Sequence, residues 1–470
     1  MSHPTVCFPE GETGSSLLHG ALEAAMRAHP TAFAGFDLPD RKTTRKRLPD
    51  VMVRFEARRA ASPHRVDLAR LLSAYVAERT MWGDEPLAEA IEAGDPGERA
   101  EQAGEAAPGW VPALDYRGQR WEGAAIAALA DRLRADHQLT TAAADALKWV
   151  AKELLQAPVD LTGHTFALLG AGAELAPTTY LLQAGARVLW VDRQAPKLAP
   201  SSFAGTLVHY EGAGDLLMQP GAIREAVARE AAQSEVHLGL FAYAPGKGRE
   251  LLLTAAMNGI AAATEPASVA MLVSPTTPGE VQPEDRVDRA TRRAQAPRWQ
   301  RALARARVLA EPSYEAVGDV QIAKSIVPLQ GPTYLAAQYL AKMMAAEAWV
   351  ADRAPLRVSS NVAGITHTKS LEHPLFLAGF RGGPTFGVEI FTPEQTRVLT
   401  TLLMLHDVLR PDAPGACADG GPCAQARRMA AQSIHGGVRS APFVLDHTIR
   451  VAAVVGLGKE PSLLLKLRGA

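Results

Sequence analysis

The sequence has few cysteines and no long apolar run. Its 470 residues include three cysteines, too few for a disulfide framework and without partners at the spacing of a metal site. The longest apolar stretches, such as residues 250–257, fall well short of a membrane span. The first residues lack the charged and apolar regions of a secretory signal. We therefore expect a cytoplasmic protein with no metal and no membrane anchor.

An excess of charge of one sign is also missing. The chain carries 49 Lys and Arg against 50 Asp and Glu, a formal net charge of −1. This balance indicates no general attraction for nucleic acid or for a membrane surface. Apolar residues make up 47% and charged residues 21% of the chain, as in a globular protein. We expect a small-molecule substrate and, because most soluble oligomers are symmetric homo-oligomers, self-association.

The chain divides into three regions by its pattern of apolar residues. Residues 1–155 show helical spacing and are predicted to be mainly helical, with a Gly- and Pro-rich loop at 94–110. Residues 156–392 alternate short apolar runs with helical segments, which predicts a dinucleotide-binding and catalytic domain. Residues 393–470 form a helical C-terminal extension. The predicted fold class is α/β, with a doubly wound parallel Rossmann-type sheet flanked by these helical regions.

A glycine turn follows the first apolar run of the central region. In HTFALLGAGAELAP, Gly170 permits a tight turn after a strand, and Gly172 lets the backbone approach a pyrophosphate at the start of a helix. Asp192 ends the next predicted strand, where a carboxylate accepts hydrogen bonds from the adenosine ribose. Arg193 is placed to meet a 2′-phosphate instead. The residues expected to bind the dinucleotide here are Gly170, Gly172, Ala173, Glu174, Asp192 and Arg193.

This motif departs from the strict G-x-G-x-x-G fingerprint, because Leu175 stands at the third glycine. Two other interpretations stay open. One is a glycine turn in an α/β protein that binds no nucleotide. The other is binding of S-adenosylmethionine, since methyltransferases also combine a G-x-G turn with an acidic strand end.

Three further apolar runs end in short polar motifs: FAYAPGKG (241–248), LVSPTTP (272–278) and SSNVAGITHTKSL (359–371). With these motifs, the chain from about 160 to 392 resembles the short-chain dehydrogenase/reductase superfamily. The resemblance implies a catalytic serine at Ser274. It also implies cofactor contacts from Ala244, Pro245, Gly246, Gly364 and Thr366.

The segment QGPTYLAAQYLAK (330–342) predicts a helix with two tyrosines and a lysine. The superfamily usually places its catalytic Tyr and Lys one helical turn apart, but here Gln338 occupies that position for both Tyr334 and Lys342. Tyr339 lies three residues before Lys342, on the same helical face. The alternative is a core-facing helix whose lysine extends to the surface. We predict Ser274, Tyr334 and Lys342 as the catalytic group, with Tyr339 as the second candidate tyrosine.

An arginine-rich insert lies between the predicted serine and the predicted tyrosine. Residues 280–330 interrupt the strand–helix alternation and carry eight arginines between Arg286 and Arg307. Such a segment is suited to an acidic partner, for example the phosphates of coenzyme A or an acidic carrier protein. The alternative is a solvated helical face or a subunit contact.

These features together predict an oxidoreductase that transfers hydride between NAD or NADP and a carbonyl or hydroxyl substrate. Asp192 favours NAD. A tyrosine hydroxyl would donate a proton to the reacting oxygen, with lysine and serine beside it. One alternative is an enoyl-thioester reductase acting on an acyl-CoA or acyl-carrier substrate, because that branch uses stretched Tyr–Lys spacings. Another is an inactive nucleotide-binding scaffold or regulatory protein, because the usual Tyr–Lys pair is absent.

Overall fold

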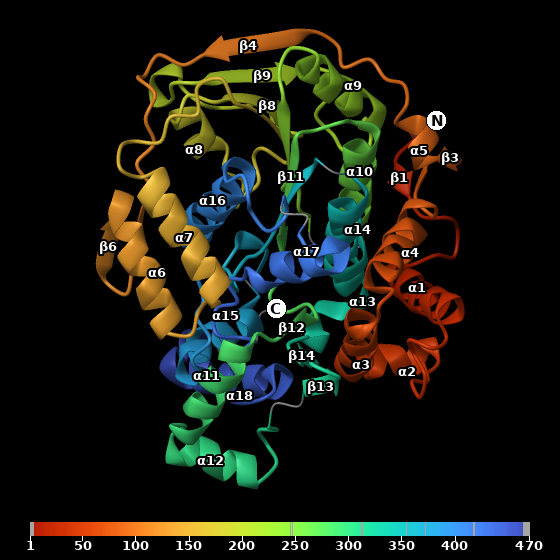
Figure 1. Ribbon diagram of the computed structural model, residues 1–470, viewed down its shortest axis with the longest axis vertical. Coiled ribbons are helices and arrows are strands. Elements are labelled where there is room, and N and C mark those ends of the chain that lie inside the picture. Colours follow the sequence, from red (N-terminus) through yellow and green to blue (C-terminus); the bar gives the residue numbers. More distant parts are fainter. Residues whose placement is uncertain are drawn as a thin grey trace.

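Seven strands form the central sheet of the computed structural model, which describes residues 4–463 except 245, 247, 312, 313, 354, 372, 417 and 418 (Figure 1). Across the sheet the strands are β15 (Arg357–Val362), β11 (Ser268–Val273), β10 (Val236–Leu240), β7 (Thr165–Leu169), β8 (Arg187–Val191), β9 (Thr206–Tyr210) and β4 (Arg99–Ala103). All neighbours pair in parallel except β4, which is antiparallel to β9.

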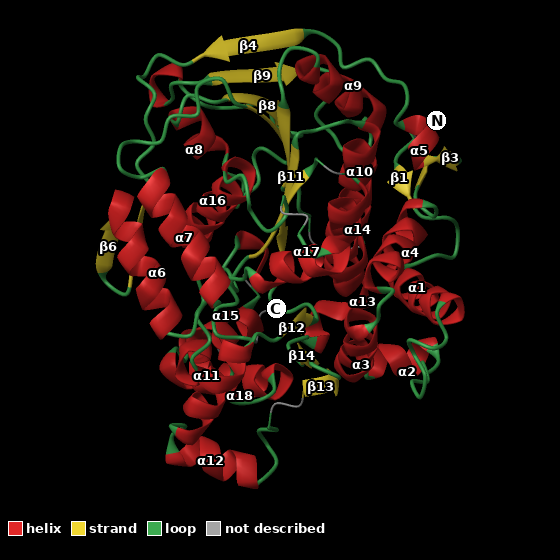
Figure 2. Cartoon of the chain, viewed as in Figure 1, coloured by secondary structure: helices red, strands yellow, loops and turns green. Residues whose placement is uncertain are grey.

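The six parallel strands follow the order 3-2-1-4-5-6 when numbered along the chain from β7, the order of a doubly wound Rossmann-type sheet. Successive strands are added toward one edge of the sheet from β7 to β9 and toward the other edge from β10 onward, so the order reverses between β7 and β10. In such sheets, ligands bind beyond the carboxyl ends of the strands at this reversal. The predicted α/β fold class is confirmed, and both terminal regions are largely helical (Figure 2).

Both faces of the sheet are covered by helices, which explains why its central strands are continuously apolar. On β7, Phe166 and Leu168 face one core, whereas Ala167 and Leu169 face the other. The first core is covered by α6 (Ile126–Ala135), α7 (Thr141–Glu153), α8 (Thr178–Gln183) and α16 (Pro393–Leu409). The second is covered by α9 (Pro220–Ala231), α10 (Arg249–Ala263) and α14 (Ala345–Asp352).

The N-terminal region forms a third apolar core against the helix that carries the predicted tyrosines. Its helices are α1 (Gly14–Ala28), α2 (Arg41–Lys46), α3 (Leu48–Ala61), α4 (Arg65–Ala77) and α5 (Leu87–Ala90). Short strands accompany them: β1 (Val6–Cys7), β2 (Met81–Trp82), β3 (Glu85–Pro86), β5 (Ala113–Tyr116) and β6 (Gln119–Glu122). Helices α1, α3 and α4 form this core with α13 (Gly331–Ala336) and with the π-helical segment Ala337–Met344 that continues it.

The insert and the end of the C-terminal extension lie together beyond the sheet (Figure 1). The insert folds as α11 (Pro283–Ala294) and α12 (Arg298–Arg305) with a small sheet of β12 (Gly279–Glu280), β14 (Val320–Ala323) and β13 (Tyr314–Val317). The extension adds α17 (Gly421–Ala431) and α18 (Leu445–Lys459), and α18 packs on α15 (Pro374–Gly382). Among the described residues, no helix is both long enough and apolar enough to span a membrane.

Buried charges join the N-terminal helices to the rest of the molecule. The Glu347 carboxylate of α14 accepts from Arg59 Nη1 at 2.8 Å and from Arg65 Nη2 at 2.7 Å. Arg59 also forms two bonds of 2.7 Å with Glu56. All four side chains are almost fully buried. Burial alone would raise the pKa of Glu347, but Arg59 and Arg65 outweigh it and lower this pKa to about 2.

We predict that Glu347→Gln lowers the free energy of unfolding by about 3–5 kcal/mol, because two buried guanidinium groups lose their shared counter-charge. Urea denaturation at neutral pH measures the change. Glu92→Gln, at an exposed position in the N-terminal region, is the control and should change stability by less than about 0.5 kcal/mol.

The same carboxylate predicts a pH dependence. Its pKa is about 2 in the folded protein against an ordinary value of 4.5, so its contribution is fully present above about pH 4.5 and is lost as the pH falls toward 2. Urea denaturation between pH 4.5 and pH 2 should show that the free energy of unfolding falls more in the natural chain than in Glu347→Gln. Parallel losses in the two proteins would contradict this role.

Candidate functional site

The glycine turn lies at the carboxyl end of β7, beside the reversal of the sheet. Gly170 has a φ of +91°, and a Cβ there would lie 2.3 Å from the main-chain nitrogen of Ala242. The Gly170 and Ala171 N–H groups donate to the Val191 carbonyl at 2.8 and 3.1 Å. Glycine is therefore required at position 170 both by backbone conformation and by close packing against the chain after β10.

The helix that follows is separated from the glycine turn by a short loop. Helix α8 starts at Thr178 and not at Gly172, because Pro177, which cannot donate within a helix, stands directly before it. The Thr178 hydroxyl instead donates to the Ala171 carbonyl and closes the loop. Two peptide N–H groups at the loop tip, those of Glu174 and Leu175, form no hydrogen bond with the described residues.

Asp192 lies where a ribose-binding carboxylate is expected, at the end of β8 against the glycine loop. Its Oδ2 accepts from the Gly172 N–H at 3.1 Å, and its Oδ1 accepts from the Gln194 N–H at 3.1 Å. Arg193 is exposed and pairs with Asp215 at 3.2 Å. Two free N–H groups beside a carboxylate form a donor and acceptor set that fits the pyrophosphate and ribose of a dinucleotide.

The other predicted cofactor contacts lie at neighbouring strand ends. Ala244 and Gly246 follow β10, and Pro245 lies outside the described residues. After β15, Gly364 packs so closely against Phe391 that a Cβ would lie 2.3 Å from its ring. The buried Thr366 hydroxyl bonds the Gly364 carbonyl at 2.9 Å and the Thr396 hydroxyl at 2.6 Å.

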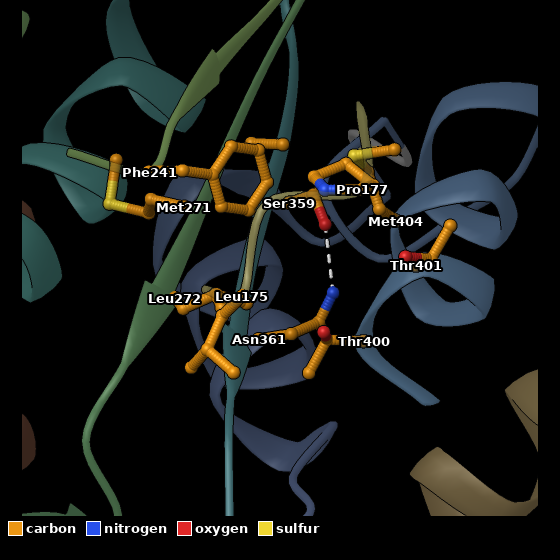
Figure 3. Close-up of a pocket in the computed structure, with 11 residues that line it drawn as sticks. Leu175, Pro177, Phe241, Met271, Leu272, Ser359, Asn361, Thr400, Thr401 and Met404 are labelled. Carbon is orange, nitrogen blue, oxygen red and sulfur yellow. Dashed lines mark hydrogen bonds between the residues drawn. The ribbon is translucent and has the colours of Figure 1, made fainter. Parts of the chain in front are cut away.

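A contact between loops connects these strand ends. The Glu174 carboxylate accepts from the Lys369 N–H at 3.1 Å, so the loop after β7 is tied to the loop after β15. Nearby, side chains of the loop after β7, of Phe241 after β10, and of β11, β15 and α16 line a cavity of about 10 Å³, which has room for one water molecule. In Figure 3, Leu175 and Phe241 lie on one side of this cavity and Thr401 and Met404 on the other.

Ser274 and Tyr334 lie close together at the carboxyl end of β11, where the Ser274 hydroxyl bonds the Thr276 hydroxyl at 2.8 Å. Ser274 directly follows this strand, and Tyr334 lies in α13, which begins after Gly331 with a φ of +76°. Burial raises the pKa of the Tyr334 phenol. The neighbouring Ser274 side chain opposes that rise, and the nearby Glu250 carboxylate adds to it. Tyr334 therefore keeps its proton at neutral pH.

Gln338 connects this pair to two buried charges. Its Oε1 accepts from the Ser274 N–H at 2.9 Å, and its Nε2 donates to Glu250 Oε1 at 3.1 Å. Lys342 Nζ donates to the same Glu250 oxygen at 3.0 Å. The second Glu250 oxygen is buried and has no hydrogen-bond partner among the described residues. Lys342 thus reaches the predicted catalytic group through Glu250 and Gln338.

The π-helical segment explains how Gln338 and Lys342 reach one oxygen. In a π-helix each N–H bonds the carbonyl five residues earlier, so a turn is wider than in an α-helix. Residues 338 and 342 then project from one face toward α10, at whose N-terminus Glu250 lies. Single π-turns are rare and occur frequently at functional sites.

Tyr339 faces the opposite side of this helix. It is fully buried and its hydroxyl donates to Glu56, in the network with Arg59 and Glu347. Burial, together with the Glu56 charge, raises its pKa well above the ordinary value. The structure therefore places Ser274, Tyr334 and Lys342 in one cluster and Tyr339 in the contact with the N-terminal helices.

Glu250 and Gln338 are members of this cluster that sequence reasoning missed as functional groups. Glu250 follows the glycine turn after β10 and lies in the first turn of α10, a position at which a carboxylate is favoured by the helix dipole. That position was the available signal.

The chain matches no family model, no curated protein and no solved structure.

We predict that Gln338→Leu lowers the free energy of unfolding by roughly 1–3 kcal/mol, because the part-buried Ser274 N–H loses its acceptor whereas Glu250 keeps its ion pair with Lys342. Chemical denaturation measures the loss. Gln233→Leu, at an exposed position whose amide bonds only the Arg229 carbonyl, should cost less than about 0.5 kcal/mol. Equal costs at both positions would show that Gln338 does not hold the cluster together.

Proposed function

We propose that this chain is an NAD(P)-dependent oxidoreductase of short-chain dehydrogenase/reductase type, which reduces a carbonyl substrate. The observation that carries the proposal is that Ser274 and Tyr334 lie close together at the carboxyl end of a central parallel strand. This strand lies in a sheet with the 3-2-1-4-5-6 strand order and a G-x-G turn at its first strand. The position of Ser274 and Tyr334 relative to the sheet therefore supports the proposal more strongly than the spacing between Tyr334 and Lys342 does.

In this proposal the strand ends hold the dinucleotide. The N–H groups of Glu174 and Leu175 would donate to the pyrophosphate, and Asp192 would accept from the adenosine ribose. The bound nicotinamide supplies the hydride. NAD is favoured over NADP because Asp192 is turned toward the loop, whereas Arg193 already pairs with Asp215.

The protein side chains then act on the substrate oxygen. Ser274 orients a carbonyl by donating a hydrogen bond, and Tyr334 donates a proton to the oxygen as negative charge develops there. A phenol that holds its proton at neutral pH suits this direction of reaction. Lys342 and Gln338 fix the cluster through Glu250, so their part is positional.

A second candidate rests on the same cluster. Lys342 donates to Glu250 and not to Tyr334, so the Tyr–Lys partnership of the superfamily is replaced. This observation favours a nucleotide-binding regulatory protein without turnover. The two candidates differ in one result: both bind a dinucleotide, but one alone consumes it in the presence of a substrate.

For binding, we predict that NADH quenches tryptophan fluorescence and raises the melting temperature. Asp192→Asn should weaken NADH binding about 10- to 100-fold, because a hydrogen bond to a charged group contributes roughly 1.5–3 kcal/mol. Asp160→Asn is the matched control, since Asp160 also accepts from the N–H two residues on but lies before β7. Absence of any response to NADH and NADPH would contradict both candidates.

For turnover, NADH or NADPH oxidation is followed with a panel of ketones and a crotonyl thioester, which distinguishes carbonyl from enoyl reduction. We predict that Tyr334→Phe lowers kcat about 10²- to 10⁴-fold, the usual effect of removing a general acid, with cofactor affinity nearly unchanged. Tyr75→Phe, in α4 of the N-terminal region, should retain full activity. Unchanged kcat in Tyr334→Phe would remove this tyrosine from the mechanism.

A further inference from the structure

The arginines of the insert fall into two groups in the structure. Arg289 and Arg292 are largely enclosed and bond main-chain carbonyls of the C-terminal extension: Arg289 Nη2 donates to the Arg439 oxygen at 2.6 Å, and Arg292 Nη1 donates to the Gly437 oxygen at 3.1 Å. Burial lowers the pKa of both guanidinium groups, that of Arg289 to about 9. These arginines attach the insert to the protein.

The second group lies on α12 and just after it. Arg298, Arg301, Arg305 and Arg307 are exposed, and none forms a side-chain hydrogen bond or ion pair with the described residues. Residues 289–310 contain no lysine and no acidic residue. Figure 1 shows α12 projecting at the end of the molecule opposite β4, so the four charges stand in solvent away from the sheet.

Helix α12 is held firmly from its other side. Gln300 is buried and its amide donates to the Thr385 carbonyl at 2.9 Å. Leu303 and Ala304 pack on the small apolar cluster around Phe386 and Phe443. The arginine-bearing side is therefore presented on a fixed element, and a partner would not have to order it.

Apolar groups lie among these charges. Trp299 is 40% exposed and Val308 47% exposed, and the Trp299 ring is held edge-on against Phe386 at 5.7 Å between centroids. Trp and Arg are the side chains most enriched among residues that dominate protein–protein binding. The surface formed by Arg298, Trp299, Arg301, Arg305 and Val308 is called the α12 surface below.

We propose that the α12 surface docks an acidic partner protein whose carboxylates surround an apolar patch. Arginine without lysine suits this partner, because a guanidinium group forms paired hydrogen bonds to a carboxylate. A nucleic acid is disfavoured because the chain has a net charge of −1. A membrane is disfavoured because Trp299 is packed against Phe386 and is not free to insert.

Helix α2 provides a second basic surface that serves as a control. Helix α2 also exposes Arg41, Lys42 and Arg45, but none of the exposed large apolar side chains lies on α2. Nonspecific attraction of acids would treat the two basic surfaces alike. The proposed docking also requires the apolar side chains Trp299 and Val308, so the partner should bind at α12 and not at α2.

The test uses the full chain and a fluorescent synthetic peptide, a helix with a stripe of glutamates beside a stripe of leucines, with a scrambled peptide of the same composition as control. Fluorescence anisotropy measures binding. Arg298→Glu/Arg301→Glu/Arg305→Glu should weaken binding of the ordered peptide about tenfold or more. Trp299→Ala, which leaves the charge unchanged, should weaken it about tenfold. The matched reversal Arg41→Glu/Lys42→Glu/Arg45→Glu should change it less than about twofold.

Failure of the peptide to bind, equal binding of the scrambled peptide, or equal loss in the α2 variant would overturn the proposal. Duplex DNA and vesicles containing phosphatidylserine form the other arms. Tighter binding of either one, lost on charge reversal in α12, would assign the surface to that class and would contradict an acidic protein. Circular dichroism and melting temperature of each variant show that the fold is retained. The result is independent of whether the chain binds NADH.

Discussion

The Glu250 carboxylate holds together the parts on which the candidate site depends. One of its oxygens accepts from both Gln338 and Lys342, and Gln338 in turn fixes the chain at Ser274. Helix α10, the end of the next strand β11, and the π-helical segment much later in the chain are therefore joined through one buried charge. A carboxylate at this depth is costly to bury unless it is paired, so the ion pair with Lys342 and the amide of Gln338 are conditions for the arrangement.

The π-helical segment is fixed from both sides by charge. Toward the sheet, Gln338 and Lys342 reach Glu250; toward the N-terminal helices, Tyr339 reaches Glu56, next to Arg59 and Glu347. Removing one member of such a network leaves an unpaired buried group, which costs more than the bond itself contributes. The N-terminal region thus has a definite part in the candidate site, because it holds the helix from which Tyr334 meets Ser274.

Sequence patterns predicted the sheet well because its strands are buried on both faces and read as continuous apolar runs. They did not predict β4, whose residues RAEQA are polar and alternate between exposed and half-buried at the sheet edge. The helical pattern TTYLLQ correctly gave α8 its start at Thr178. The π-helical turn and the Glu250 bridge have no local signature, because they arise from contacts between residues 88 or more positions apart. The same holds for the arginines of the insert, which only the structure separates into buried and exposed groups.

The central claim is that the carboxyl ends of the parallel strands bring a dinucleotide to the Ser274–Tyr334 pair. A crystal structure of the full chain with NADH tests it most directly. The predicted result is density for the dinucleotide across the loop of residues 170–176, with its adenosine ribose at Asp192 and its nicotinamide facing the Tyr334 hydroxyl. Density at another surface, or a nicotinamide that faces neither Ser274 nor Tyr334, would contradict the claim.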